Sequence, residues 1–577
     1  MTANRATIKI SALACTHTPT EWDQRYPYTA DLLCLSFCHP PQEHHWQELY
    51  QVSTPLEVEA WEVALAAHPD RAYARYICWG LREGFRIGFQ HGRPLESATV
   101  NMPSTGLRPE AISSYIEGEQ AKGRMLGPFP PAWRQHLHVN RFGLIPKGHN
   151  TGKFRLITDL SFPRGRSVND GISSELTSLS YISVDNVGEI VASMGAGALL
   201  AKMDIESAYR LVPVHPQDRI LQAVEWEGHI FVDPMLPFGL CSAPKIFNSL
   251  ADALNWCLQQ AGIRYVLHYL DDFIIIAPPD SQECEEALAI LDRVCDQLNI
   301  PMAAHKREGP TTCLIFLGIL IDTVAGELRL PEEKLARLRA LLHQWGEKRA
   351  CTRRELESLI GLLNHACKVV RPGRAFLRRL LDTLHGAEAR PGSNGFVRLN
   401  VSCRTDIAWW REFVTLWNGV SFLHPPHLLP SVMMTSDASG AWGCAAWHNL
   451  SWFQVQWDSR AEGFSIAAKE FIPIILACVA WGGAWRAHRV ICRCDNQVVV
   501  AALRARSSRD RGVMHLLRCL AFVKEWLGCH LAAEYIDTHS NHLADDLSRD
   551  RASSFLSKLW EPTTTPLQHH RDSSMSS

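Results

Sequence analysis

Two adjacent aspartates interrupt an apolar run at residues 266–277, VLHYLDDFIIIA, and no other feature of the chain restricts the fold as much. The flanking residues predict buried strands, yet the burial of even one unpaired carboxylate costs several kcal/mol. A hairpin with Asp271 and Asp272 at its turn, facing a cleft, would resolve this conflict. A plain Asp-Asp β-turn on the surface is the competing interpretation, and this segment alone does not decide between them.

Two earlier segments favour the hairpin. The first, ALLAKMDIESAYRLVPV (198–214), is an apolar strand that carries one carboxylate, Asp204, with Tyr209 five residues later. The second, LPFGLCSAPKIFNSLADALNWCL (236–258), predicts a turn at Gly239 and then a helix, with Ser242 at its cap and Pro244 in its first turn. The chain therefore offers three carboxylates on strands that could share one cleft.

The order of these motifs resembles the palm of reverse transcriptases. Upstream, KFRLITDLS (153–161) resembles the fingers motif of that family, and FLGILID (316–322) resembles its primer-gripping turn. The palm motifs themselves are Asp204-x-x-x-Ala208-Tyr209, LPFGL-x-SAP and Tyr269-Leu270-Asp271-Asp272. Because five motifs occur in the family's order, a chance match is very improbable.

This resemblance implies an RNA-directed DNA polymerase that joins nucleotides by in-line phosphoryl transfer. Such enzymes use two Mg²⁺ ions, typically ~3.5–4 Å apart, and Mg²⁺ prefers oxygen ligands. The resemblance implies that Asp204 and Asp271 bridge the ions and that Asp272 completes the negative cluster. Ile205 is expected as a further ligand position, and Mn²⁺ as an alternative ion.

The resemblance also implies a set of deoxynucleotide-binding residues, namely Arg155, Lys153, Ala208, Tyr209, Phe238 and Lys306. Arg155 would grip the triphosphate, because a guanidinium matches phosphate oxygens. The GHNTGK loop leaves open whether Lys147 or Lys153 assists it. Tyr209 would select against a ribose 2′-OH, with core packing as the alternative, and Lys306 would protonate the leaving pyrophosphate unless it is a solvated loop lysine.

A second set of carboxylates lies between residues 433 and 550, on four different predicted elements. Their order resembles that of ribonuclease H, which would cleave the RNA of an RNA–DNA hybrid with two metal ions and read backbone shape and 2′-OH groups. The residues implied as catalytic and metal-binding are Asp437, Glu470, Asp495 and Asp545. Asp545 fits the motif better than Asp546, and His539 is the candidate for proton transfer.

The chain has 577 residues, too many for one core. The predicted fold class is multidomain α+β: a right-hand polymerase with fingers, ferredoxin-like palm and helical thumb or connection, followed by an α/β ribonuclease H-like domain. The predicted parts are a partly disordered N-terminal extension (1–54), a helical region bracing the fingers (55–135), fingers and palm (136–325), helical thumb or connection (326–428), the ribonuclease H-like domain (429–552) and a disordered tail (553–577).

The net charge of −2 neither favours nor excludes a nucleic-acid partner, because phosphate binding needs only a local basic patch. Two such groups occur at residues 368–379 and 504–511, with a solvated helix face as the alternative for each. No apolar stretch is long enough for a membrane span, and the scattered cysteines indicate reduced thiols. We therefore expect an intracellular protein of the cytoplasm, the nucleus or both.

Phrases such as GRMLGPFPP, SVNDGIS and LPFGLCSAPKIF resemble the polymerase protein of DIRS-group retrotransposons, which are related to Gypsy-type elements. The resemblance implies an RNA template, a DNA primer, RNA–DNA hybrids and deoxynucleoside triphosphates as partners. An element-encoded capsid-like protein and a tyrosine recombinase would be further partners. The alternative is a catalytically inactive nucleic-acid-binding remnant of such an element.

Overall fold

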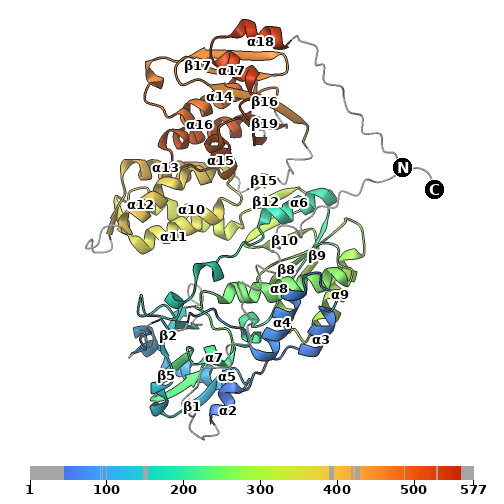
Figure 1. Ribbon diagram of the computed structural model, residues 1–577, viewed down its shortest axis with the longest axis vertical. Coiled ribbons are helices and arrows are strands. Elements are labelled where there is room, and N and C mark those ends of the chain that lie inside the picture. Colours follow the sequence, from blue (N-terminus) through green and yellow to red (C-terminus); the bar gives the residue numbers. More distant parts are fainter. Residues whose placement is uncertain are drawn as a thin grey trace, which may run out of the picture. The chain divides into compact units, whose positions relative to one another are not determined.

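The computed structural model comprises two compact units, and each is described by itself (Figure 1). The first unit contains residues 1–190 and 197–314, and the second contains residues 191–196 and 315–577. Much of the predicted N-terminal extension and of the predicted tail lies outside the described residues. The structure describes residues 45–90, 92–93, 95–98, 100–146, 154–388, 396–416, 420–422, 429–485, 488–527 and 530–559.

A four-stranded antiparallel sheet and two helices form the centre of the first unit. Their chain order is β-α-β-β-α-β and the strand order is β7-β8-β4-β9, which is the ferredoxin-like arrangement predicted for the palm. The elements are β4 (Leu199–Asp204), α8 (Ala243–Gln260), β7 (Val266–Tyr269), β8 (Asp272–Ala277), α9 (Glu283–Gln297) and β9 (Glu308–Thr311).

The predicted helix is present as α8, and it packs on this sheet through one apolar face. Ile246, Phe247, Leu250 and Leu254 are all buried in one core with the sheet. Ser242 is the residue before the helix, but the prediction that its side chain caps the helix is wrong. Its hydroxyl instead donates to the carbonyl of Ile87 at 2.8 Å, which ties the start of α8 to an upstream segment.

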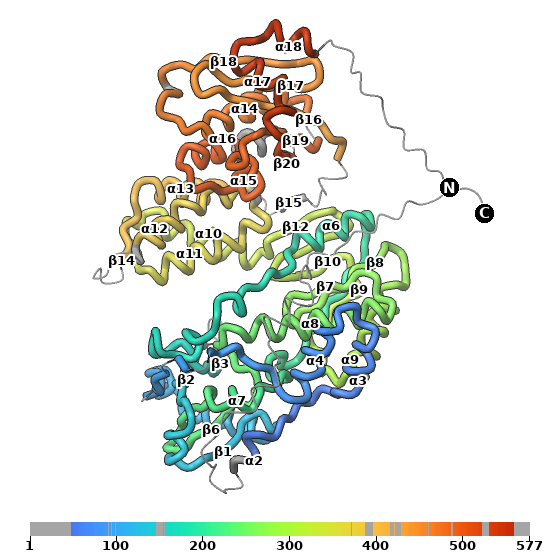
Figure 2. Tube along the Cα trace, viewed as in Figure 1, coloured from blue at the N-terminus to red at the C-terminus, as the bar shows by residue number. Residues whose placement is uncertain are grey.

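Helices α3 (Val58–Ala64) and α4 (Arg71–Glu83) pack on the palm, not on the fingers as predicted for residues 55–135. The Tyr73 hydroxyl donates to the carbonyl of Ser249 in α8 at 2.5 Å. Figure 2 shows α3 and α4 in blue, beside the green helices α8 and α9. The apolar periodicity predicts these helices correctly, but it carries no information about which partner they pack against.

The fingers consist of a five-stranded sheet in the order β1-β6-β5-β2-β3, on which α5 (Pro109–Gln120) packs. Its strands are β1 (Leu126–Phe129), β2 (Val139–Pro146), β3 (Phe154–Asp159), β5 (Ala223–Trp226) and β6 (His229–Val232). The other helices of this part of the chain are α2 (His45–Tyr50), α6 (Val184–Met194) and α7 (Pro216–Arg219), with short 3₁₀ helices at Ala208–Leu211 and Ala304–Lys306.

The second unit begins with a small sheet and a group of helices, as predicted for the thumb or connection. A capping box, which the Thr-x-x-Glu spacing of residues 352–355 favours, starts α11: the Thr352 hydroxyl accepts from the Glu355 N–H, and the Glu355 carboxylate accepts from the Thr352 N–H. The elements are β10 (Cys313–Phe316), β11 (Ile319–Asp322), β12 (Glu327–Arg329), α10 (Glu332–Trp345), β13 (Ala350–Thr352), α11 (Arg353–Ala366), α12 (Arg378–Glu388), β14 (Phe396–Arg398), α13 (Val401–Leu416) and β15 (Val420–Phe422).

A five-stranded mixed sheet follows in the order β18-β17-β16-β19-β20. The first three strands are antiparallel, and β19 and β20 extend the sheet in parallel with β16. The two kinds of sheet confirm the predicted class of an α+β polymerase fold with a further α/β domain. The elements are β16 (Ser431–Ala438), β17 (Gly443–His448), β18 (Ser451–Gln456), α14 (Ile466–Trp481), β19 (Arg489–Cys494), α15 (Gln497–Ala505), α16 (Arg511–Leu527), β20 (His530–Tyr535), α17 (His542–Ser548) and α18 (Ala552–Leu559).

The predicted disordered tail starts too early, because α18 covers Ala552–Leu559. Phe555 is 1% exposed and packs with Leu547 and Ala445, so the helix gains an apolar contact that offsets the cost of ordering it. The single aromatic residue in a Ser-rich stretch is the only sequence signal for this helix.

A buried carboxylate joins the connection helices to the α/β domain within the second unit. Asp406 of α13 is fully buried and binds Arg379 of α12 at 3.0 Å and Arg518 of α16 at 3.2 Å. Burial raises the pKa of Asp406 to about 6, against the opposing effect of the two guanidinium groups. A buried carboxylate of this kind depends on both partners.

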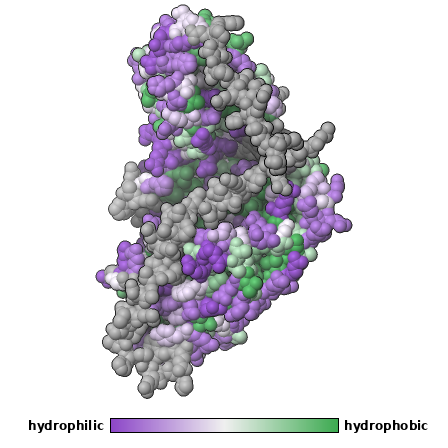
Figure 3. Space-filling model, turned by 45° about the vertical axis from the view of Figure 1, so that its right-hand side comes forward, coloured by the Kyte–Doolittle hydropathy of each residue, from purple (hydrophilic) through white to green (hydrophobic). Residues whose placement is uncertain are grey.

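None of the described helices is long and apolar enough to cross a membrane. On the face drawn in Figure 3, hydrophilic side chains are spread over the described surface, with smaller hydrophobic areas among them.

Candidate active sites

The two aspartates of the palm hairpin lie at its turn, next to the end of β4. Tyr269 pairs with Asp272 across the hairpin, and Asp204 pairs with Asp272 across the neighbouring strands. Leu270 adopts a positive φ of 53°, and the carbonyl of Asp271 accepts from the N–H of Ile205 at 3.1 Å. The structure thus brings the three predicted carboxylates together at one edge of the sheet.

These three carboxylates affect one another strongly. Burial, hydrogen bonding to Asp204 and the charge of Asp271 together raise the pKa of Asp272 to about 6. Burial also raises the pKa of Asp271, with a contribution from the charge of Asp204. Partly buried acids that repel one another are suited to a divalent cation, because the cation neutralises them. The residues present therefore fit a magnesium site.

Lys306 is the cation nearest to this cluster among the interactions the structure describes. Its Nζ donates to Asp204 Oδ1 at 2.6 Å, although half of the lysine side chain is exposed. The hydrogen bond to Asp204 raises the lysine pKa. The solvated-loop alternative therefore does not describe this lysine, which contacts a candidate metal ligand directly.

Aromatic rings surround the carboxylates. Tyr209 follows Ala208 in a 3₁₀ turn, and its ring lies 5.4 Å from that of Phe238 and 5.4 Å from that of Phe247. Tyr181 stacks on Tyr269 of the hairpin at 4.7 Å. The sequence reasoning missed Tyr181, because its segment, SLSYIS, contains no pattern that sets this tyrosine apart.

The turn that carries Phe238 is held close to the fingers. Gly239 has a φ of 105°, and a Cβ there would lie 2.5 Å from the carbonyl oxygen of Thr158, so only glycine fits. The Asn169 side chain donates to the carbonyl of Gly239 at 2.9 Å and accepts from the N–H of Cys241 at 3.0 Å. Asn169 is a positioning residue that the sequence reasoning missed, although it lies in the family-like phrase SVNDGIS.

The predicted triphosphate-binding residues are described only in part. Arg155 lies in β3, where its backbone pairs with Ile145 of β2. Lys147 and Lys153 lie outside the described residues. The choice between the two lysines therefore stays open.

The second set of carboxylates meets at the centre of the five-stranded sheet. Asp437 lies in β16, Glu470 in the second turn of α14, Asp495 directly after β19 and Asp545 in the first turn of α17. Ligand atoms of Glu470, Asp495 and Cys494 all lie within 4.8 Å of one another. Four elements that are far apart in sequence thus place their acids in one region.

Burial and mutual repulsion dominate the electrostatics of this second site. Burial, together with the charges of Asp437, Asp495 and Asp545, raises the pKa of Glu470 to about 9. Burial raises the pKa of Asp437 to about 6, against a hydrogen bond from the Ser548 hydroxyl at 2.5 Å. These carboxylates also form an oxygen-rich set that fits divalent cations.

Cys494, His539 and Asn541 adjoin the elements that carry these acids. Cys494, which the sequence reasoning missed, lies 3.9 Å from Glu470 through its Sγ, and burial raises the pKa of its thiol. It is therefore a neutral neighbour and not a hard oxygen ligand. His539 is exposed in the turn before α17, where its carbonyl accepts from the ring of His542. The Asn541 amide donates to Asp437 at 3.1 Å and orients that carboxylate.

The structure separates the adjacent acids Asp545 and Asp546. Asp545 accepts hydrogen bonds from Arg549 and Arg551 at 2.6 and 2.7 Å and faces the other acids. Asp546 is 4% exposed and binds Lys558 and Ser554 of α18 at 2.5 and 2.9 Å. Asp546 therefore anchors the terminal helix, and Asp545 is the metal-ligand candidate.

We expect substitution of Asp546 to lower mainly the stability of the fold, and substitution of Asp545 to lower mainly the cleavage of hybrids. Asp546→Ala should lower the free energy of unfolding by about 2 kcal/mol, because it leaves charged partners unsatisfied. Asp545→Ala should cost less than about 1 kcal/mol, because its arginine partners are half exposed, but should remove hybrid cleavage. Thermal unfolding and a hybrid-cleavage assay on both variants check this. Loss of stability with Asp545→Ala alone would contradict the assignment.

Comparison with known proteins gives a family match for part of the chain. Residues 145–321 match the model of the family described as "Reverse transcriptase (RNA-dependent DNA polymerase)". The Transposon Tf2-3 polyprotein of Schizosaccharomyces pombe is 20% identical over 427 residues, which cover 70% of this chain and 28% of that protein. The Pro-Pol polyprotein of feline foamy virus is 25% identical over 224 residues, covering 38% of this chain and 17% of that protein.

Among solved structures, one of the foamy viral protease-reverse transcriptase in complex with double-stranded DNA is similar, with 14% identity and a TM-score of 0.46. The match covers 87% of this chain and 84% of the foamy viral chain. The chain spans less than a third of the length of the polyproteins that it matches. The matched span contains the three palm carboxylates and the LPFGL turn, and residues 145–321 of this chain accordingly form a reverse transcriptase domain.

Proposed function

We propose that this chain is the RNA-directed DNA polymerase of a retrotransposon, and that it also cleaves the RNA strand of RNA–DNA hybrids. The observation that carries the first part is the meeting of Asp204, Asp271 and Asp272 at the palm hairpin, inside the segment that matches the reverse transcriptase family. The second part rests on the four carboxylates of the mixed sheet.

In the polymerase site the carboxylates would hold two Mg²⁺ ions, or Mn²⁺ in their place, with the main chain of Ile205 as a further ligand. The ions would polarise the phosphoryl group and stabilise the attacking and leaving oxygens. Asp204 and Asp271 would be the shared ligands, since the main chain of Asp271, in the hairpin turn, accepts a hydrogen bond from Ile205, the residue after Asp204. The raised pKa of Asp272 reflects burial and the neighbouring carboxylates, and a bound cation would favour its ionised form.

Other side chains would bind and orient the substrates. Lys306 would donate a proton toward a leaving pyrophosphate, and its contact with Asp204 in the metal-free chain supports a position beside the reacting groups. Tyr209 and Phe238 would form an aromatic wall against the sugar, which disfavours a 2′-OH. Ala208 would leave room beside them, and Arg155, with Lys153 or Lys147, would bind the triphosphate.

In the nuclease site Asp437, Glu470, Asp495 and Asp545 would hold the metal ions that activate a water molecule against the RNA strand. Asn541 and Ser548 fix the orientation of Asp437, so the site is preorganised at that ligand. His539 is exposed beside α17 and could accept or donate a proton there.

The element that encodes the chain would belong to the DIRS group, on the strength of the phrases GRMLGPFPP and SVNDGIS. Its partners would be an RNA template, a DNA primer, hybrids, deoxynucleoside triphosphates, a capsid-like protein and a tyrosine recombinase. A solved relative is described as a complex with an RNA/DNA hybrid, which supports the choice of hybrid as a ligand. A recombinase gene beside the gene for this chain would support the element type.

Metal binding should be visible without catalysis. The raised pKa values mean that the metal-free folded chain holds protons that the unfolded chain has released, so stability falls as pH rises from about 4 to about 6 for Asp272 and Asp437, and to about 9 for Glu470. Mg²⁺ binds the ionised carboxylates and opposes this loss. We expect Mg²⁺ to raise the melting temperature by several degrees at about pH 8 and by much less at about pH 5. Differential scanning fluorimetry in EDTA and in Mg²⁺, at matched ionic strength, measures this.

The direct test is extension of a DNA primer on an RNA template by the unmodified chain. Extension should require Mg²⁺ or Mn²⁺ and should stop in EDTA. A chain that binds primer–template tightly and never extends it would favour the inactive remnant.

A further inference from the structure

A groove lined by six arginines lies in the second unit, and no proposed catalytic carboxylate lines it. Its volume is about 880 Å³. The arginines come from α12, from β14, and from α16 with the loop before it, so two segments some 110 residues apart in sequence contribute. They are Arg378, Arg379, Arg398, Arg509, Arg511 and Arg518. The fold thus combines the two basic groups that the sequence contains.

The charges of this arginine groove are only partly compensated. Arg378 pairs with Asp382 at 2.8 Å. Buried Asp406 pairs with both Arg379 and Arg518, so its single negative charge compensates only one of these two positive charges. Arg398, Arg509 and Arg511 are exposed and have no ion-pair or hydrogen-bond partner in the part of the chain that the structure describes. Four positive charges therefore remain, and three of them are on guanidinium groups that can turn toward a ligand.

Two buried arginine nitrogen atoms also favour an anionic ligand in the groove. The Nε atoms of Arg378 and Arg518 are buried and have no hydrogen-bond partner among the described residues. Arg518 is held by Asp406, and burial and the nearby Arg379 lower its pKa. Like charges kept this close are favourable only when an anion compensates them.

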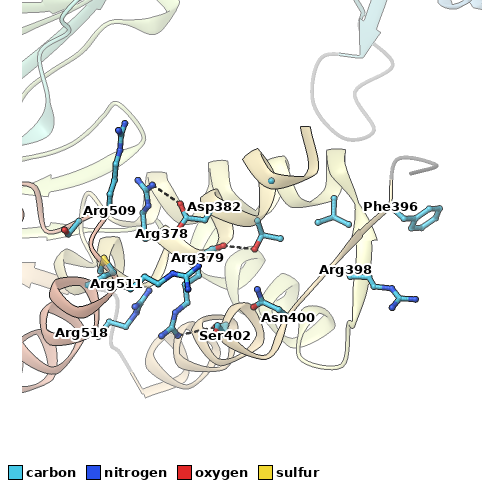
Figure 4. Close-up of a pocket in the computed structure, with 15 residues that line it drawn as sticks. Arg378, Arg379, Asp382, Phe396, Arg398, Asn400, Ser402, Arg509, Arg511 and Arg518 are labelled. Carbon is cyan, nitrogen blue, oxygen red and sulfur yellow. Dashed lines mark hydrogen bonds and ion pairs between the residues drawn. The ribbon is translucent and has the colours of Figure 1, made fainter. Parts of the chain in front are cut away.

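The shape of the groove favours an extended ligand over a compact one. In Figure 4, Arg378, Arg379, Arg509, Arg511 and Arg518 lie at one end, and Arg398 with Phe396 lies at the other. The polar side chains of Asn400 and Ser402 lie between the two ends. A compact polyphosphate would need the cations to converge on one point, whereas phosphates along a strand would meet them in succession.

Phe396 distinguishes a nucleic acid from a simple polyanion. Its ring is 61% exposed at the rim of the groove, on the short strand that also carries Arg398. Exposed aromatic rings beside a basic groove stack on unpaired bases. A duplex would keep its bases stacked on one another and would leave this ring unused.

The groove is tied to the helix that carries Glu470. Asp510 lies between Arg509 and Arg511 and accepts from the hydroxyl of Ser465 at 2.8 Å. Ser465 is the N-cap residue of α14, five positions before Glu470. A strand held by the groove would therefore be fixed relative to the proposed nuclease site.

We propose that the arginine groove binds a single strand of nucleic acid, with its phosphates on Arg398, Arg509 and Arg511 and one base stacked on Phe396. The choice of nucleic acid as the anion rests on the proposed function. The binding itself needs no catalysis, so it can be tested in EDTA.

The probe is a 20-nucleotide oligodeoxynucleotide with 5-iodouracil in place of thymine, irradiated with the full-length chain in EDTA. We expect a photo-crosslink in the peptide that contains Phe396, identified by mass spectrometry. The triple variant Arg398→Ala/Arg509→Ala/Arg511→Ala should reduce it about tenfold at about 0.1 M salt, and the slope of log affinity against log salt for this site should fall by about 2, at ~0.7 per phosphate contact. Phe396→Ala should remove the crosslink, and Phe396→Tyr should retain it.

The matched control is Arg75→Ala/Arg337→Ala/Arg354→Ala, which removes three exposed arginines outside the groove and changes the net charge equally. It should leave the crosslink unchanged. Equal loss in both triple variants would mean bulk attraction and would overturn the proposal. The proposal would also be overturned if inorganic polyphosphate displaced the oligonucleotide and an abasic oligonucleotide bound as tightly as the probe. If the unmodified chain formed the crosslink but did not extend a primer, the result would count against the polymerase function and not against the groove.

Discussion

Asp271→Asn should reduce primer extension by about a thousandfold or more and leave binding of primer–template almost unchanged. The amide keeps the size of the side chain but removes the charge that two metal ions would share. A loss of this size corresponds to about 4 kcal/mol of transition-state stabilisation, within the range expected for metal-ion catalysis. Single-turnover extension on an RNA template, with binding measured separately, gives both quantities.

The folded state is expected to tolerate this change. The pKa of Asp271 is raised by burial and by the charge of Asp204, so removing its charge relieves repulsion in the metal-free chain. The matched control is Asp292→Asn on α9, a half-exposed aspartate that pairs with Arg307 and should change extension less than about twofold. Extension by Asp271→Asn at the unmodified rate would remove the two-metal assignment of the palm.

Glu470→Gln should stop cleavage of the RNA strand in a hybrid and leave DNA synthesis intact. The carboxylate lies next to Asp495, and its pKa of about 9 reflects burial and the three neighbouring acids, so metal binding is what would keep it ionised at neutral pH. Glutamine cannot supply that charge, and we expect a loss of at least about a thousandfold in cleavage. The isosteric change should also stabilise the metal-free fold slightly.

The two activities are measured separately on the same protein preparation. Cleavage is followed on an RNA–DNA hybrid with labelled RNA, and synthesis is followed by primer extension. Glu462→Gln, an exposed glutamate in the loop before α14, is the matched control and should affect neither activity. If Glu470→Gln abolished synthesis together with cleavage, the two sites would not be independent.

The sequence predicts the palm well because its signals are local. The apolar strands, the aspartates at their ends and the buried face of α8 each follow from a short pattern, and the ferredoxin-like order then brings Asp204 to Asp272. The capping box at Thr352 and Glu355 is equally local. The roles of the individual carboxylates stay predictions until the substitutions are measured.

Features that depend on contacts between distant segments could not be predicted. Nothing in SLSYIS indicates that Tyr181 stacks on the hairpin, and the periodicity of α4 does not reveal that Tyr73 bonds to α8. Ser242 occupies the cap position, but its hydroxyl has a better acceptor in Ile87. The helix at Ala552–Leu559 depends on the pocket that Phe555 fills, which exists only after the sheet has formed.

The buried Asp406 has a consequence for any attempt to divide this chain. A cut near residue 428, where a domain boundary would be drawn from composition, would separate Asp406 from Arg518. One fragment would then contain the carboxylate without this arginine, and the other would contain the arginine without its carboxylate. Each fragment would then have to hydrate a charge that the intact chain keeps dry. The part that contains the mixed sheet should therefore be expressed with α10–α13 attached and with a start ahead of β10 (Cys313–Phe316), so that Asp406 keeps both arginine partners and the small sheet stays whole.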